Sequence, residues 1–454
     1  MNTVEDGSAE RGGADDEALL RKTYIVAQWR ILPILFCLWM LAWVDRSNIA
    51  FAKLQMLGDL KFGETTYGFG AGLFYVGYVV FGVPTSLVQK RYGARWVLSG
   101  LAVCWGLTSF MMTFVHTASQ FYVLRLLLGV FEAGFYPGVI LYFNTWFAGK
   151  RRARNFSIVH SGSVCSTVAV GLTGGYVLEH ISGAGGFEGW RWMFLGQAVP
   201  TVLLALVAFF MLADRPDNAR WLSQRQRTLI NEDLRDSPEL LDNTSPEPGS
   251  RIFNSSIWIL TAAYFSLMVA TTAIIFFAPT ILREAGFGGY RGIGAAVAGT
   301  CILGALGNIL ISTLGGDAKR RQTFCALAAS ITAVSLLILV FVWHSSTVAT
   351  FIALTLGFAG TGAGITLFWQ LSVGLLDRKA TIIGVPFINS VGCAAGFFTP
   401  FLISYMRDMT GSYMSGFVTA ACVQALGVLV VLFGVRFIIR RRSRGNEVSL
   451  QGVA

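Results

Sequence analysis

The chain has 454 residues, of which 54% are hydrophobic and only 13% are charged. About a quarter of the residues of soluble domains are charged, so this composition excludes an ordinary water-soluble protein and indicates a membrane protein. The net charge of +10 does not indicate nucleic-acid binding, because the basic residues cluster in short loops between apolar segments.

The N-terminal segment is polar and of mixed charge, and it contains no apolar core followed by a small-residue cleavage site. This pattern is not that of a signal peptide, so we expect the first apolar segment to be retained as a span. A span needs about 20 mostly apolar residues. Twelve segments meet that rule: 30–52, 66–88, 95–115, 119–144, 155–178, 190–212, 256–282, 291–315, 322–343, 348–374, 381–405 and 413–438.

One long polar stretch separates six spans from the other six, and we expect a short interfacial helix within it, at 217–235. The predicted parts are an N-terminal tail (1–29), a six-helix half (30–212), a linker (213–254), a second six-helix half (255–438) and a C-terminal tail (439–454). Basic loops follow spans two and eight, and small residues fill spans five and eleven. These matching features predict an all-α membrane protein with two homologous halves around a site at the membrane midplane.

The distribution of basic residues predicts the orientation. Clusters lie at 90–95, 150–154 and 319–321, all on the side of the termini, whereas the opposite loops carry few, including Lys53 and Lys61. Positively charged loops stay on the cytoplasmic side, so we expect both termini in the cytoplasm. The short loops and tails suit a plasma membrane, such as a bacterial inner membrane.

Four charged residues lie inside predicted spans: Asp45, Arg46, Arg125 and Glu132. Such residues cost roughly 2.5–3.5 kcal/mol at the centre of a span, and they often mark an ion or substrate path. Arg46 and Arg125 each lie about six residues from the outer end of their predicted spans, so we expect them at a similar depth. Two guanidinium groups there can bind an organic anion, or instead pair with the acids for structure.

Glu132 follows Arg125 by seven residues, on the same helical face, although a direct contact is not assured. A carboxyl group in a low-dielectric span beside an arginine is balanced between its charged and neutral forms. We therefore predict Glu132 as the main proton carrier and Asp45 as the second. The alternative for Asp45 is a structural partner of Arg46.

Several segments resemble the major facilitator superfamily, and within it the anion:cation symporter branch of organic-acid and sugar-acid permeases. They include VDRSNIAFA, VPTSLVQKRYGAR, RLLLGVFEAGFYPGVILYFNTWF, SIWILTAAYF, ITLFWQL and IGVPFINSVGCAAGFFTPFL. The resemblance covers nearly the whole chain and implies the twelve-helix major facilitator fold, alternating access and proton symport. Family members often carry Tyr and Trp in the seventh span, where this chain has Thr272 and Phe277.

The second half has no charged residue at mid-span, so its part of the site should be neutral. By the resemblance, Asn389 is the strongest candidate for a substrate contact. Further candidates are uncharged polar or aromatic residues in spans two, ten and eleven: Tyr75, Tyr78, Trp369, Gln370 and Ser390. His160, at the start of span five, fits a structural role better.

The sequence predicts a transporter and not an enzyme. Neither a phosphate-binding GxxxxGK[ST] loop nor a catalytic triad is present, and the seven cysteines are scattered, so no cofactor, metal or disulfide is expected. The expected partners are a small organic anion, protons and the lipid bilayer, with the protein acting as a monomer. An exchanger, an exporter and a non-transporting membrane sensor stay open as alternatives. So do aromatic acids, sugar acids and dicarboxylates as substrates, and Na⁺ in place of protons.

Overall fold

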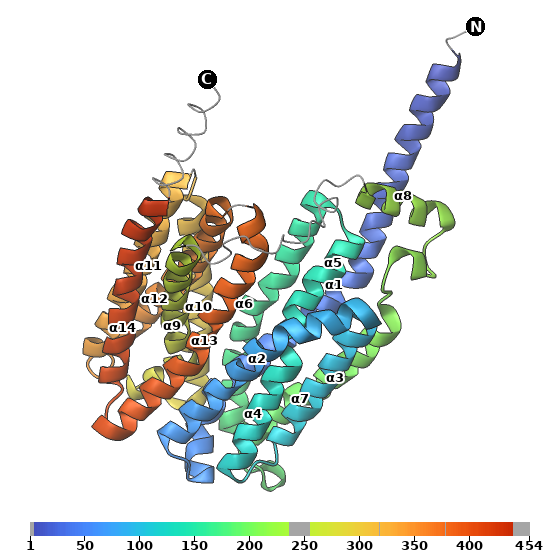
Figure 1. The fold of residues 1–454 in the computed structure, drawn as a ribbon. Helices are drawn as coiled ribbons and strands as arrows, with labels where there is room; N and C mark the ends of the chain where they lie inside the picture. The colour runs from blue at the N-terminus through green and yellow to red at the C-terminus, as the bar shows by residue number, and fades with distance from the viewer. Residues whose placement is uncertain (1–3, 236–254, 317, 377, 439–454) are drawn as a thin grey trace, which may run out of the picture.

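The computed structural model describes residues 4–235, 255–316, 318–376 and 378–438, and the regular elements within these ranges are helices. They form two bundles that lie side by side (Figure 1). The first contains α1 (Val4–Leu60), α2 (Glu64–Tyr92), α3 (Ala94–Met112), α4 (Ala118–Glu132), α5 (Phe135–Trp146), α6 (Gly149–His180) and α7 (Gly189–Met211). The second contains α9 (Ser255–Glu284), α10 (Gly289–Thr313), α11 (Ala318–Val342), α12 (Thr347–Leu375), α13 (Arg378–Thr410), α14 (Met414–Leu429) and η3 (Val430–Gly434).

Eleven helical segments in the described ranges are long and apolar enough to cross a membrane, and α4 and α5 together make one of them. Helix α3 is not among the eleven, but it packs against α4 and α7 inside the first bundle. The all-α fold class is confirmed, and the arrangement is consistent with twelve crossings in two halves. The first span was predicted to end at residue 52, whereas α1 continues to Leu60 and includes Lys53.

The fourth crossing is interrupted directly after Glu132, where α4 ends and α5 begins at Phe135. Pro137 explains the interruption, because it has no N–H to donate to the carbonyl of Ala133, four residues earlier. Gly134 lies between α4 and α5, and a larger residue would not fit there, because a Cβ would lie 2.1 Å from a methyl carbon of Thr85. The break places the carboxyl group of Glu132 at a helix C-terminus, where the partial negative charge makes a nearby cation favourable.

The described part of the linker packs on the first bundle. It contains η2 (Pro216–Asn218) and α8 (Gln224–Arg235), which overlap the predicted interfacial helix. The rings of Trp221 and Trp146 stack at 5.6 Å, and the hydroxyl of Tyr24 donates to Asp233 at 2.6 Å. Residues 236–254 and the predicted C-terminal tail lie outside the described residues.

The start of α1, the last described residues after η3 and helix α8 lie at one end of the molecule, which we call the termini face; the opposite end is the far face (Figure 1). The two bundles meet mainly through α2 with α13 and α6 with α10. These contacts concentrate toward the far face, where the backbones approach closely. A Cβ on Gly294 would lie 2.0 Å from the carbonyl oxygen of Gly171, and one on Gly68 would lie 2.4 Å from that of Pro400. Small residues of this kind allow close packing of helices in membranes.

Candidate functional site

Arg46 and Glu132 form an ion pair inside the first bundle. The Nε atom of Arg46 lies 2.8 Å from Oε2 of Glu132. The side chain of Glu132 is fully buried, whereas that of Arg46 is 16% exposed. Because the acid is sealed and the base is partly open, only the guanidinium can meet a ligand without rearrangement.

Aromatic rings surround the guanidinium of Arg46. Its Cζ atom lies 5.1 Å from the ring centroid of Trp43, 5.2 Å from that of Phe74 and 4.7 Å from that of Tyr78. Cation–π contacts of this kind stabilise a desolvated cation and limit its movement. The rings therefore hold the guanidinium in place while leaving part of it open.

Arg125 lies close to the same group but is completely buried. Its Cζ atom lies 5.1 Å from the ring centroid of Phe74, so this ring contacts both arginines. Its Nη2 atom donates to the carbonyl of Ala71 at 3.4 Å, and its Nε and Nη1 atoms have no hydrogen-bond partner in the structure. Buried donors without partners are costly, so Arg125 is well placed to take up an acceptor when the site rearranges.

Asp45 is buried and has its own polar surroundings. Its Oδ1 atom accepts a hydrogen bond from Ser109 at 3.4 Å, and its Oδ2 atom has no partner in the structure. Asn48, one helical turn further on, donates to Gln197 of α7. The ion pair of Arg46 is therefore made with Glu132, and Asp45 belongs to a neighbouring polar cluster that reaches α3 and α7.

The second bundle contributes uncharged groups. The hydroxyl of Tyr264 in α9 donates to Oδ1 of Asn389 in α13 at 3.5 Å, and the ring of Tyr264 contacts that of Trp369 in α12 at 4.9 Å. Cys393, one turn after Asn389, lies within electrostatic reach of Arg46. The predicted candidates Asn389 and Trp369 are thus brought together on the bundle that faces Arg46.

Tyr75 and Tyr78, one turn apart on α2, take different places. Tyr78 contacts Arg46 as described, whereas the ring of Tyr75 packs across the interface against Phe276 at 6.2 Å and against Gly396. Tyr75 therefore closes the interface on the far-face side of the arginine.

Other predicted positions are not linked to Arg46 by the contacts of the described residues. Gln370 is exposed, and its backbone carbonyl accepts from Arg321 at the end of α11 nearest the termini face. Ser390 is half-buried beside Asn389.

The ring of His160 lies 5.4 Å from that of Trp39, on the termini-face side of the site. Thr272 donates to the backbone of its own helix.

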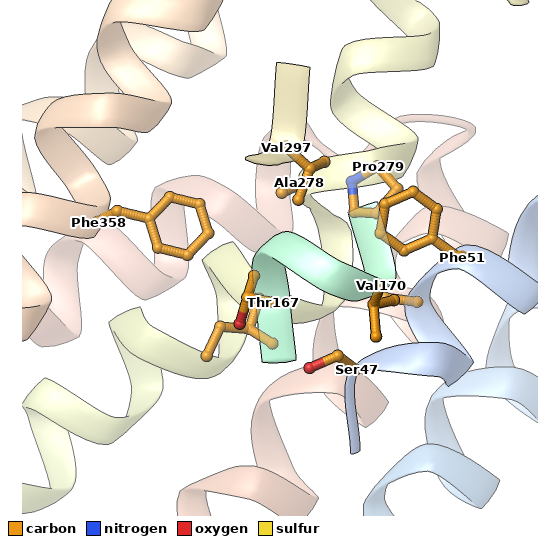
Figure 2. Close-up of a pocket in the computed structure, with 10 residues that line it drawn as sticks. Ser47, Phe51, Thr167, Val170, Ala278, Pro279, Val297 and Phe358 are labelled. Carbon is orange, nitrogen blue, oxygen red and sulfur yellow. The ribbon is translucent and has the colours of Figure 1, made fainter. Parts of the chain in front are cut away.

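A small pocket lies on the seam between the bundles (Figure 2). Its walls come from α1, α6, α9, α10 and α12, and they include Phe51, Val170, Pro279 and Phe358. Ser47 is one of only two hydroxyl-bearing residues in this lining, and its hydroxyl already donates to the backbone of its own helix. The lining of this pocket contains no charged residue.

Sequence reasoning missed Tyr264, Phe74 and the cluster of Ser109 and Gln197. In the sequence, Tyr264 and Phe74 look like ordinary residues of apolar spans. Only the fold shows that Tyr264 contacts Asn389 and that Phe74 contacts both arginines. Ser109 and Gln197 carry a usable signal, since polar side chains in apolar spans need partners.

Among the described residues, no group of three or more His, Cys, Asp or Glu side chains could hold a metal ion.

Comparisons with known proteins agree with this architecture. The sequence profile described as Major Facilitator Superfamily matches residues 35–400. A protein of Agrobacterium vitis, whose name provisionally assigns it tartrate transport, is 34% identical over 92% of this chain and 94% of its own length. NicT of Pseudomonas putida, provisionally named a metabolite transport protein, is 32% identical over 92% of this chain and 95% of its own length.

A solved D-xylose–proton symporter has the same fold, with a TM-score of 0.70 at 13% identity, covering 89% of this chain and 97% of the symporter. At that identity the likeness concerns the fold alone. The profile match and the two bacterial relatives go further, because they extend over most of the chain. This protein is therefore a multi-pass membrane transporter and not an enzyme, and it belongs to the Major Facilitator Superfamily.

Proposed function

We propose that this protein imports an organic acid across the bacterial inner membrane by proton symport, with both termini in the cytoplasm. The observation that carries the proposal is the ion pair of Arg46 and Glu132, in which the base is partly open and the acid is sealed. The provisional names of the two relatives, which refer to tartrate and to a metabolite, support an organic acid as the cargo.

Arg46 is proposed to bind the carboxylate of the substrate. A guanidinium offers a planar fork of donors that matches a carboxylate, and charge-assisted bonds of this kind are strong. Asn389 and Tyr264, on the opposite bundle, would hydrogen-bond the rest of the substrate, with the Trp369 ring packing beside it. Because the two bundles then hold one molecule between them, bound substrate favours closure around the site.

Glu132 is proposed to couple the proton to the substrate. While it is ionised, it competes with the substrate carboxylate for Arg46. Protonation removes that competition and frees the guanidinium, so proton and anion each make binding of the other more favourable. Release toward the cytoplasm would restore the original ion pair.

Arg125 and Asp45 would stabilise the intermediate state. When Glu132 leaves Arg46, its carboxyl group can turn toward the unpartnered donors of Arg125, which approach the same Phe74 ring. Asp45 serves as a second proton site in the neighbouring cluster. The neutral carboxyl group would accept a hydrogen bond from a buried donor of Arg125 that otherwise has no partner, which offsets part of the cost of leaving Arg46.

The test is uptake of radiolabelled acids into proteoliposomes, with and without an inward proton gradient. The panel contains aromatic acids, sugar acids and dicarboxylates. We expect gradient-stimulated uptake of one class by the unmodified protein, and its loss in Glu132→Gln with binding or exchange retained. Glu232→Gln, an exposed carboxylate in α8, is the matched control and should behave normally.

Full gradient-driven accumulation by Glu132→Gln would contradict the coupling role. Exchange without any dependence on the gradient would assign the protein as an antiporter. No uptake of any acid would overturn the organic-acid proposal itself.

A further inference from the structure

A further ion pair of the first bundle lies near the far face, where the two bundles meet. Lys53 of α1 is 3% exposed, and its Nζ atom lies 2.8 Å from Oε2 of Glu64, at the first residue of α2. The same Nζ donates to the hydroxyl of Tyr413 at 2.9 Å, and that hydroxyl donates to Oε1 of Glu64. Tyr413 belongs to the second bundle, so its hydroxyl joins both charges of the first bundle to the second.

Aromatic rings from both bundles enclose the ammonium group of Lys53. Its Nζ atom lies 4.9 Å from the ring centroid of Tyr67, 4.6 Å from that of Phe277 and 4.8 Å from that of Tyr413. Phe277 and Tyr413 come from the second bundle. A lysine that is buried in this way is desolvated, and it needs these contacts to remain charged.

Neighbouring hydrogen bonds cross the same interface. Thr65 donates to Asp408 twice, from its backbone N–H at 2.8 Å and from its hydroxyl at 2.6 Å. Arg283 donates to the backbone carbonyl of Leu54 at 2.9 Å. The connection is therefore a network around Lys53 and not a single contact.

Separation of the bundles would move Tyr413 away from Lys53 and Glu64. Lys53 and Glu64 belong to the same bundle and would stay together, whereas the hydroxyl of Tyr413 would lose both of its hydrogen bonds. Burial, and next the negative charge of Glu64, raise the pKa of Tyr413 well above its usual range. The hydroxyl therefore stays protonated and keeps donating to Glu64.

We propose that Lys53, Glu64 and Tyr413 form a latch that holds the far face closed and that releases whenever the two bundles separate there. The polar groups satisfy one another only while the bundles touch, so opening costs the two bonds of Tyr413 and the aromatic cover of Lys53. The latch thereby sets how often the far face opens, independently of what the central site binds.

The test measures opening without any substrate. Ser404 of α13 is fully buried on this seam, where a Cβ on Gly68 would lie 2.5 Å from its Cβ. A Ser404→Cys variant is treated with a maleimide in detergent, and alkylation at position 404 alone is followed by mass spectrometry, so the native cysteines can remain. Tyr413→Phe is then added, which removes the hydroxyl and keeps the ring.

We expect Tyr413→Phe to raise the alkylation rate about tenfold, which corresponds to about 1.4 kcal/mol. Tyr405→Phe is the matched control, because Tyr405 lies on α13 near the same end and is exposed; its rate should not change. Glu64→Gln should also raise the rate, and it decides the question if Tyr413→Phe does not fold. Unchanged rates in folded Tyr413→Phe and Glu64→Gln proteins would overturn the latch. Because the assay uses neither substrate nor membrane orientation, its failure would leave the proposed transport function intact.

Discussion

Two ion pairs made by basic residues of α1 have the same length and opposite exposure. Arg46–Glu132 and Lys53–Glu64 are both 2.8 Å long. In the first pair the side chain of Arg46 is 16% exposed and that of Glu132 is fully buried; in the second the side chain of Lys53 is 2% exposed and that of Glu64 is 19% exposed. Distance therefore does not distinguish the pairs, but exposure does.

The difference suggests different tasks. An open guanidinium over a sealed carboxylate can exchange its partner for an external anion, and the carboxylate must then be neutralised. The ammonium group of Lys53 is buried beneath Phe277 and Tyr413 of the other bundle, which leave no room for a ligand. It can respond only when those two residues move away. The following predictions would break or sharpen this comparison, beginning with the largest expected effect.

Replacing Arg46 by Ala should have the largest effect. It leaves the buried carboxylate of Glu132 without a partner, so the free energy of unfolding should fall by about 3–5 kcal/mol. Apparent substrate affinity should fall about 100-fold or more, because the guanidinium group proposed to bind the substrate carboxylate is lost. Thermal unfolding in detergent and uptake kinetics measure the two effects.

The double variant Arg46→Ala/Glu132→Gln separates these effects. It should recover most of the stability, because the buried charge is gone, but it should not recover uptake. Recovery of uptake would show that Arg46 is not the anion ligand. Arg225→Ala removes one partner of the surface ion pair with Asp16 and should change neither property.

Gly129→Ala tests the packing that seals Glu132. A Cβ there would lie 1.9 Å from the carbonyl oxygen of Phe74, so α2 and α4 must move apart. We expect a loss of about 1–3 kcal/mol in the free energy of unfolding, together with weaker substrate binding, since Phe74 contacts both arginines. Gly100→Ala is the control, because a Cβ there meets nothing within 4 Å, and it should be neutral or stabilising. Equal stability of the two variants would contradict the proposed close contact.

Asn389→Ala tests the uncharged side of the central site. Losing one hydrogen bond to the substrate should lower kcat/KM for uptake about tenfold, with little change in thermal stability. Ser390→Ala, at the next position, should have a smaller effect because no described contact links Ser390 to the site. A larger effect at Ser390 would mean that the substrate lies on a different face of α13.

Lys53→Met should change substrate uptake least. The replacement leaves Oε2 of Glu64 buried without its cation, but the Glu64 side chain is 19% exposed, so the free energy of unfolding should fall by less than the about 3–5 kcal/mol expected for Arg46→Ala. Uptake should stay within about threefold of normal, while alkylation at position 404 becomes faster. Loss of substrate binding in this variant would remove the distinction between the two ion pairs.

Much of the architecture was readable from the sequence. Apolar segments of span length predicted the all-α class, and the polar stretch between them marked the division into two halves. The charged residues Asp45, Arg46, Arg125 and Glu132 were recognisable because charge in a span is costly unless it has a use. Their roles in transport stay predictions.

The partners of these residues were not readable. Glu132 shares a helical face with Arg125, yet its ion pair is with Arg46 of α1, which lies 86 residues earlier in the chain. The sequence predicts Lys53 in an outer loop, whereas it lies inside α1. Average hydropathy along the chain does not reveal that Glu64 and Tyr413 contact this lysine.

By itself, the sequence determined which segments enter the membrane and which charges go with them, because both depend on the transfer of local segments from water to lipid. Only the tertiary structure decided which charges pair, which one stays open and which residues of the second bundle face them. Those outcomes depend on contacts between helices distant in the chain, and the physical reason is that a buried charge takes whichever partner the packing brings within reach.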